Sequence, residues 1–274
     1  MLGKLLKYEM KMFGRILLPL YGLLIATSVI TGLSLSAVMN NVLDEYLMAF
    51  MPIVYGVILV AVGVMTIVLL INSFYKNLLG REGYLMFSLP VSTNKLISAK
   101  VISNVIWIIF SVLAFIISAS ALAFTMIGLS GEDPVTIVTP TFEEIAHTLS
   151  QVTPTMIINI ILGIVVLIVI ISLMIIRIYA AMAIGSQWNE HRIIGSILAY
   201  GGFQIAEAVI MTILGMTGYA SHYIFALLNR PFDMNGVANP FGFGLLIMIV
   251  GFGIVAAIYW FVTWYFLEKR LNLE

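Results

Sequence analysis

The sequence has no cysteine and few charged residues, and both shortages limit what the chain can be. Without cysteine, neither a disulfide framework nor a thiolate metal site is available. Only 9% of the 274 residues are charged and 62% are hydrophobic, whereas soluble domains average about 25% charged residues. A soluble globular core cannot account for this composition. We therefore expect an all-α, polytopic membrane protein.

Further absences exclude several classes of activity. The sequence contains no Gly-x-x-x-x-Gly-Lys-Ser/Thr phosphate loop, so the chain should not hydrolyse ATP by itself. Its histidines, His147, His191 and His222, are scattered along the chain, and no catalytic pair or metal site is predicted. Basic and acidic residues balance at 13 each, which argues against a nucleic-acid partner. We expect no bound cofactor and no enzymatic activity of the chain alone.

Long apolar segments predict six transmembrane helices within a single transmembrane domain, residues 1–274. Each segment is long enough to cross a hydrocarbon core of about 30 Å at the rise of an α-helix. The predicted spans are residues 16–36, 51–73, 101–129, 155–178, 193–216 and 241–266.

Residues 1–15 combine regularly spaced bases with apolar side chains. The bases, at spacings of three or four, are Lys4, Lys7, Lys11 and Arg15. This pattern predicts an amphipathic elbow helix in the headgroup region, after which the chain turns into the first span. The alternative is a basic flank that only orients that span. Ser34 and Ser36 also mimic a signal-peptidase site, but the apolar stretch before them is too long for a signal peptide.

The distribution of basic residues predicts a topology with both termini in the cytoplasm. Every base except Arg230 falls near the end of a predicted span that this topology places on the cytoplasmic side, in agreement with the positive-inside tendency. The segment 217–240 is rich in aromatic and helix-breaking residues and is too short to span. We interpret it as an extracytoplasmic re-entrant or interfacial segment.

The segment 74–100 is the only long cytoplasmic loop in this topology. Gly80 and Gly83 permit a sharp turn, residues 84–87 are apolar, and Pro90 disfavours the α conformation in the residue before it. A short element lying across the base of the membrane is therefore expected. After it, Ser92 can cap a new helix through its hydroxyl, with Lys95 and Lys100 anchoring that helix at the interface.

The motifs of this loop resemble the first cytoplasmic loop of ABC-2 type transporter permeases. The resemblance is carried by Glu82-Gly83-Tyr84-Leu85, then Ser88-Leu89-Pro90-Val91-Ser92, then Lys95 and Ala99-Lys100. It implies that the loop holds a coupling helix that docks into an ATPase subunit. The implied docking residues are Arg81, Glu82, Gly83, Tyr84, Leu85, Met86, Phe87, Leu89 and Pro90. The alternative is an ordinary interfacial loop whose Leu-Pro pair ends a helix by chance.

The same resemblance implies the partners and the location. They are two copies of an ABC ATPase that carries ATP and Mg, a second copy of this chain or a sister permease, and the lipid of a bacterial plasma membrane. An elbow helix at the N-terminus and a re-entrant element before the last span also agree with the family. We interpret the short connection around Trp188, Glu190 and Arg192 as a second, smaller docking contact, its Trp fitting the interfacial belt.

Glu207 is the one acid deep inside a predicted span. A charge at that depth is costly and is a functional hypothesis by default. Glu207 could face a translocation path, meet a basic group of a substrate, or accept hydrogen bonds from neighbouring helices. The alternative is a protonated glutamic acid bonded to a neighbour's polar group.

The leading functional hypothesis is the permease subunit of an ATP-driven exporter. Short outer loops and apolar spans favour amphipathic or hydrophobic cargo, and the resemblance to small permeases favours peptides or toxins. A lipid or drug exporter stays open, as does an ATP-independent secondary transporter centred on Glu207. A membrane-embedded enzyme is disfavoured because histidines and acids do not converge.

Overall fold

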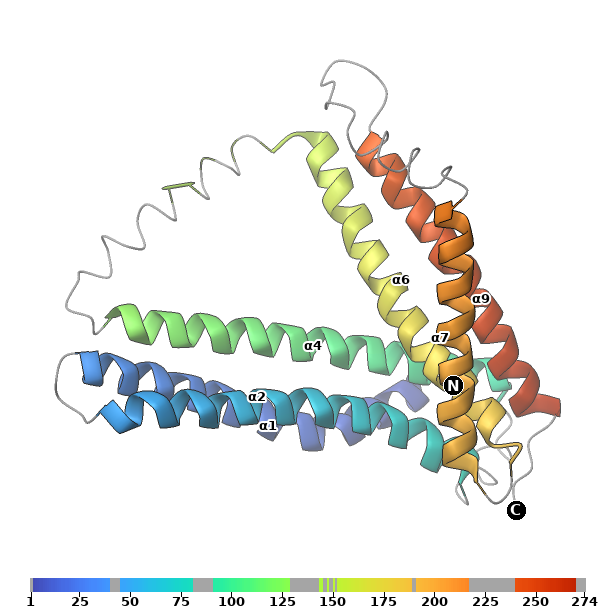
Figure 1. Ribbon diagram of the computed structural model, residues 1–274, viewed down its shortest axis with the longest axis horizontal. Coiled ribbons are helices and arrows are strands. Elements are labelled where there is room, and N and C mark those ends of the chain that lie inside the picture. Colours follow the sequence, from blue (N-terminus) through green and yellow to red (C-terminus); the bar gives the residue numbers. More distant parts are fainter. Residues whose placement is uncertain are drawn as a thin grey trace. The chain divides into compact units, whose positions relative to one another are not determined.

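The computed structural model describes the main helical parts of the chain (Figure 1). The described residues are 2–39, 45–80, 91–128, 143, 144, 147, 150, 152–188, 191–216 and 240–269. They form the helices α1 (Leu2–Met39), α2 (Glu45–Phe74), the π-helical turn η1 (Tyr75–Leu79), α4 (Thr93–Gly128), α6 (Pro154–Gly185), α7 (Arg192–Met216) and α9 (Pro240–Lys269). None of the described residues is in a strand.

Six of these helices are long and apolar enough to cross a membrane. This finding confirms the predicted all-helical, multi-pass membrane architecture. The helices extend beyond the predicted spans, since α4 begins at Thr93 instead of residue 101 and α6 continues to Gly185 instead of ending at 178. The predicted ends followed basic residues, on the assumption that a charge marks the membrane edge. Residues after Arg177 are instead good helix formers, and Tyr179 to Ala183 are buried.

The N-terminal turn expected after residue 15 is absent, because α1 is one helix from Leu2 to Met39. The physical reason is packing across the expected turn. Phe13 and Leu17 are both buried in one hydrophobic core, and a Cβ on Gly14 would lie only 3.2 Å from the Trp107 ring. A turn at residue 15 would pull this face away from its core. The expectation that the basic first turns lie in the headgroup region stays a prediction.

The predicted loop 74–100 is shorter in the structure at both ends. The chain continues from α2 into η1 and leaves the helical path at Gly80, whose backbone is extended. A Cβ there would lie 2.7 Å from the Lys76 carbonyl oxygen, so glycine suits this exit. Helix α4 starts directly after Ser92, whose carbonyl accepts the N–H of Leu96. The expected docking residues Arg81 to Pro90 lie outside the described residues, as does segment 217–239.

The chain divides into two compact units. The N-terminal unit comprises Gly3–Leu70 and Ile106–Val152, and within it α1 and parts of α2 and α4 lie side by side (Figure 1). Its core residues are Phe13, Leu17, Tyr21, Leu24, Val62, Leu69, Trp107 and Ala114. Ser111 links the helices, because its Oγ lies 2.6 Å from the Tyr21 hydroxyl and 3.1 Å from that of Thr66. Such hydroxyl pairs satisfy polar groups that lipid cannot.

The C-terminal unit comprises Met1–Leu2, Ile71–Val105 and Thr153–Glu274. In it, α6 packs against α7 and α9 (Figure 1). Tyr179 of α6 also meets the ends of α2 and α4, because its ring stacks on Phe74 with centroids 4.0 Å apart and its hydroxyl accepts a hydrogen bond from Asn104. The candidate functional site lies entirely in this unit.

Candidate functional site

Helix α7 carries a polar stripe on one face. Tyr200, Gln204 and Glu207 follow one another at spacings of four and three residues, which places them on the same side of a helix, and Phe203 lies beside Gln204 in the chain. Contacts to Arg177 of α6 and Tyr259 of α9 show that this face meets both neighbouring helices.

Glu207 forms an ion pair with Arg177 inside the helix packing. Arg177 Nη1 donates to Glu207 Oε2 at 2.7 Å, and the Tyr259 hydroxyl donates to Glu207 Oε1 at 2.6 Å. The side chains of Arg177 and Glu207 are 12% and 29% exposed. Both oxygens of the carboxylate therefore receive a donor, each from a different helix. Glu207 thus accepts hydrogen bonds from neighbouring helices, which is one of the three roles considered for it from the sequence.

Arg177 is held by Tyr200 as well as by Glu207. Its Nη2 donates to the Tyr200 hydroxyl at 3.2 Å, and its guanidinium carbon lies 5.1 Å from the centre of the Tyr200 ring. Gln204 donates to the same hydroxyl at 3.3 Å. Arg177 Nε is buried and has no hydrogen-bond partner within the described part of the chain. Cation, ring and carboxylate thus form one cluster that ties α6, α7 and α9 together.

Arg177, which the positive-inside tendency places near the cytoplasmic end of a span, lies inside helix α6 and not at its end. Arg177 lies about two turns before the end of α6, and Tyr200 lies about two turns after the start of α7. An antiparallel helix pair joined by a short connection brings these positions level. Counting from the connection could have matched Arg177 with Tyr200, but it does not single out Glu207, which lies about two turns further along α7.

Lys100 also departs from its expected place at the interface. It is 2% exposed, and its Nζ donates to the Ser73 carbonyl oxygen at 2.8 Å and to Ser73 Oγ at 3.0 Å. Because α4 begins at Thr93, Lys100 lies about two turns inside that helix. The ammonium group therefore joins the ends of α2 and α4 instead of reaching the headgroups.

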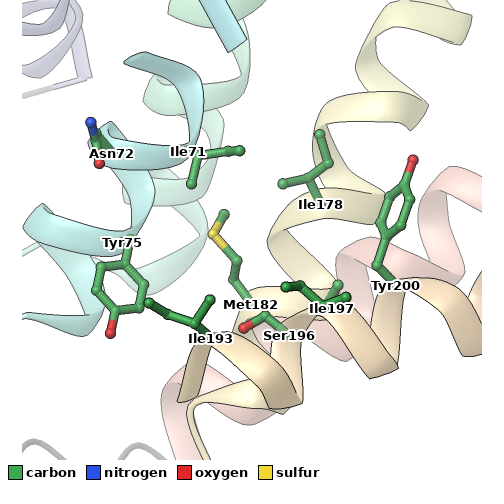
Figure 2. Close-up of a pocket in the computed structure, with 10 residues that line it drawn as sticks. Ile71, Asn72, Tyr75, Ile178, Met182, Ile193, Ser196, Ile197 and Tyr200 are labelled. Carbon is green, nitrogen blue, oxygen red and sulfur yellow. The ribbon is translucent and has the colours of Figure 1, made fainter. Parts of the chain in front are cut away.

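An apolar pocket of about 580 Å³ adjoins the cluster (Figure 2). Its wall comes from the end of α2, from η1, from α6 and from the first two turns of α7. The lining residues are Ile71, Asn72, Tyr75, Ile178, Ala181, Met182, Ile193, Ser196, Ile197 and Tyr200. The four residues on α7 follow one face of that helix. Tyr200 belongs to both features, since its ring lines the pocket and its hydroxyl bonds Arg177.

The connection between α6 and α7 is closely packed. A Cβ on Gly185 would come within 2.6 Å of Ser196 Cα, and one on Gly195 within 3.1 Å of the Trp188 ring. Trp188 packs against Gly195 and is still 53% exposed, while Arg192 starts α7. Glu190, the third residue of the expected second docking contact, lies outside the described residues. That contact stays a prediction.

The cluster joins three helices through charged and polar contacts, and the pocket can bind an apolar group. No group of three His, Asp or Glu side chains that could hold a metal ion occurs among the residues that the structure describes. Comparisons of the chain with protein-family models, with curated proteins and with solved structures give no match. The function is therefore inferred from the residues and their geometry.

Proposed function

We propose that the protein is the membrane-spanning permease subunit of an ATP-driven exporter of the ABC-2 type. The observation that carries this proposal is the junction at Tyr179. The helices on both sides of the loop that resembles a coupling segment meet α6 there, through Phe74 on one side and Asn104 on the other. Lys100 and Ser73 join the same two helix ends. A pull on the loop would reach α6 directly.

The junction adjoins both parts of the candidate site. Ile178, next to Tyr179 in the chain, lines the pocket, and Arg177 precedes it. Tyr75, directly after α2, lines the opposite side of the pocket. Movement of the loop would therefore change the width of the pocket. The pocket would then have two states that differ in width, and ATP bound to the partner subunit would shift the balance between them.

The remaining parts of the proposal follow the resemblance. Two ATPase subunits carry ATP and Mg and dock on the segment from Arg81 to Pro90, with a smaller contact around Trp188. A second copy of the chain or a sister permease completes the transporter in a bacterial plasma membrane, with both termini cytoplasmic. The apolar pocket supports amphipathic or hydrophobic cargo, and peptides or toxins remain the favoured class.

A detergent pull-down of the tagged full-length chain from its native host tests the proposal. An ATPase subunit should co-purify, with ATP hydrolysis in the eluate. Replacing Leu85, Met86 and Phe87 with Ser should remove the ATPase while membrane insertion is unchanged. A matched control replaces Ile224, Phe225 and Leu227 with Ser in the predicted extracytoplasmic segment and should retain the ATPase. Equal ATPase recovery from both triple variants contradicts the docking assignment.

A secondary transporter centred on Glu207 is the second candidate. It is favoured by the Arg177–Glu207 pair, since ionisable residues within membrane helices often mark transport pathways. In that case the chain purifies without an ATPase, and reconstituted chain alone transports its cargo. Glu207→Gln would then stop transport by the isolated chain.

A further inference from the structure

The pocket has a closed side and an open side. Ala181 and Met182 of α6 line the closed side and are only 2% and 5% exposed. Ile193 and Ile197 of α7 are both 65% exposed, and Ile71 on the opposite wall is exposed as well. These helices are apolar enough to span a membrane, so in a bilayer the exposed isoleucines of this side would meet acyl chains. A chain of methylene groups can enter the pocket sideways.

The pocket also lies close to the ends of its helices. Its α7 residues begin directly after the first helical residue, Arg192, and its α2 side ends at Tyr75, directly before Lys76. Both basic residues are therefore next in the chain to residues that line the pocket. The positive end of the α7 dipole adds to their potential. An apolar pocket with two cations beside its lining matches a molecule with a tail and an anionic head.

We propose that this pocket binds one acyl or alkyl chain of an anionic amphiphile, whose head group lies beside Lys76 and Arg192. A volume of about 580 Å³ falls within the range of small-ligand sites, about 300–1,000 Å³. A hydrocarbon chain gains little by leaving lipid tails for an apolar wall. The charge of the head group therefore decides which amphiphile occupies the pocket. Binding stands on the pocket alone, whereas its role as exported cargo rests on the proposed function.

Photolabelling of the full-length chain in phosphatidylcholine nanodiscs tests the binding. The probe is a long-chain fatty acid with a diazirine in its chain, compared with a neutral monoacylglycerol and an alkyl trimethylammonium that have the same chain. Mass spectrometry of the labelled peptides should place the fatty-acid label on the lining residues of α6 and α7. The neutral and cationic probes should label these peptides several-fold less, since each nearby cation contributes about fivefold in affinity for an anionic head.

Matched variants test separately how the hydrocarbon tail and the charged head group contribute to binding. Ile197→Trp should fill the pocket and nearly abolish labelling, whereas Leu198→Trp, at the next exposed residue of α7 but outside the lining, should leave it unchanged. Lys76→Gln and Arg192→Gln should each lower the affinity about fivefold. Lys95→Gln, an exposed base whose chain neighbours do not line the pocket, serves as the control.

Two results would overturn the proposal. One is labelling that Ile197→Trp does not reduce; if the oligomeric state of that variant also changes, the pocket is assigned to a second copy of the chain. The other is equal labelling by the three head groups. Pocket labelling without a co-purifying ATPase would uphold binding and reject the exporter, and an ATPase without labelling would do the opposite.

Discussion

The Arg177–Glu207 pair leads to a quantitative prediction about stability. Arg177→Met keeps most of the aliphatic volume and removes the guanidinium, so that Glu207 retains only the Tyr259 donor among the contacts described above. Breaking a buried pair in this way costs about 3–5 kcal/mol. Because Glu207 is 29% exposed, we expect the lower end, about 3 kcal/mol.

The reciprocal change should cost less. Glu207→Gln keeps a carbonyl acceptor for the Tyr259 hydroxyl, and Arg177 keeps its contacts with the Tyr200 ring and hydroxyl. A cation over an aromatic ring contributes about 0.5–2 kcal/mol, which limits the loss. We expect a destabilisation of about 1.5 kcal/mol for Glu207→Gln, from the lost charge-assisted hydrogen bond.

The double variant Arg177→Met with Glu207→Gln tests whether the two effects are coupled. It contains no unpaired charge, so it should be more stable than Arg177→Met alone. A total cost of about 1.5–2 kcal/mol and a coupling free energy of about 2.5–3 kcal/mol are expected, within the range for residues in direct contact.

Thermal unfolding of the four proteins in one detergent measures the cycle. In a chain of this size each kcal/mol shifts the midpoint by about 2–4 °C, so Arg177→Met should unfold about 6–12 °C below the parent. Ser172→Ala, which removes only a hydroxyl bonded to its own helix, should change stability by less than about 0.5 kcal/mol. Additive single effects, within about 0.5 kcal/mol, would refute the ion pair.

Two further predictions concern packing and a buried charge. Gly32→Ala should destabilise the chain by about 1–3 kcal/mol, because its Cβ would lie 2.8 Å from the Leu122 carbonyl oxygen. The control Gly22→Ala, whose Cβ would have nothing within 4 Å, should stabilise the chain by about 0.5–1 kcal/mol. Equal unfolding midpoints of the two variants would contradict the close approach at Gly32. Lys100→Met should lower the free energy of unfolding by about 1–2 kcal/mol, because the hydrogen bonds to Ser73 are lost. Lys100→Ala should lower it by at least about 1 kcal/mol more, because removal of the aliphatic stem leaves a cavity. The same thermal assay would show whether the two variants differ.

Properties that depend on consecutive residues could be predicted from the sequence alone. The apolar length of each helix is local, and a membrane admits only chains that satisfy their own backbone hydrogen bonds. Six helices therefore follow from hydropathy. The break at Gly80 and the helix start after Ser92 are also local, because they depend on the backbone preferences of single residues. Glu207 was identifiable as a residue in need of partners.

The identity of those partners depended on tertiary structure. Arg177 of α6 and Tyr259 of α9 both donate to Glu207 of α7, and Tyr200 holds Arg177. Nothing in the local pattern around any one of them specifies the others. The same holds for Lys100, because only the approach of α2 to α4 places the Ser73 carbonyl oxygen where it accepts a hydrogen bond from the buried ammonium group. Hydropathy thus determined that the chain forms membrane helices, whereas packing between helices decided which charges remain inside and where the apolar pocket lies. The physical reason is that burial and pairing are properties of surfaces in contact, and those surfaces come from distant parts of the sequence.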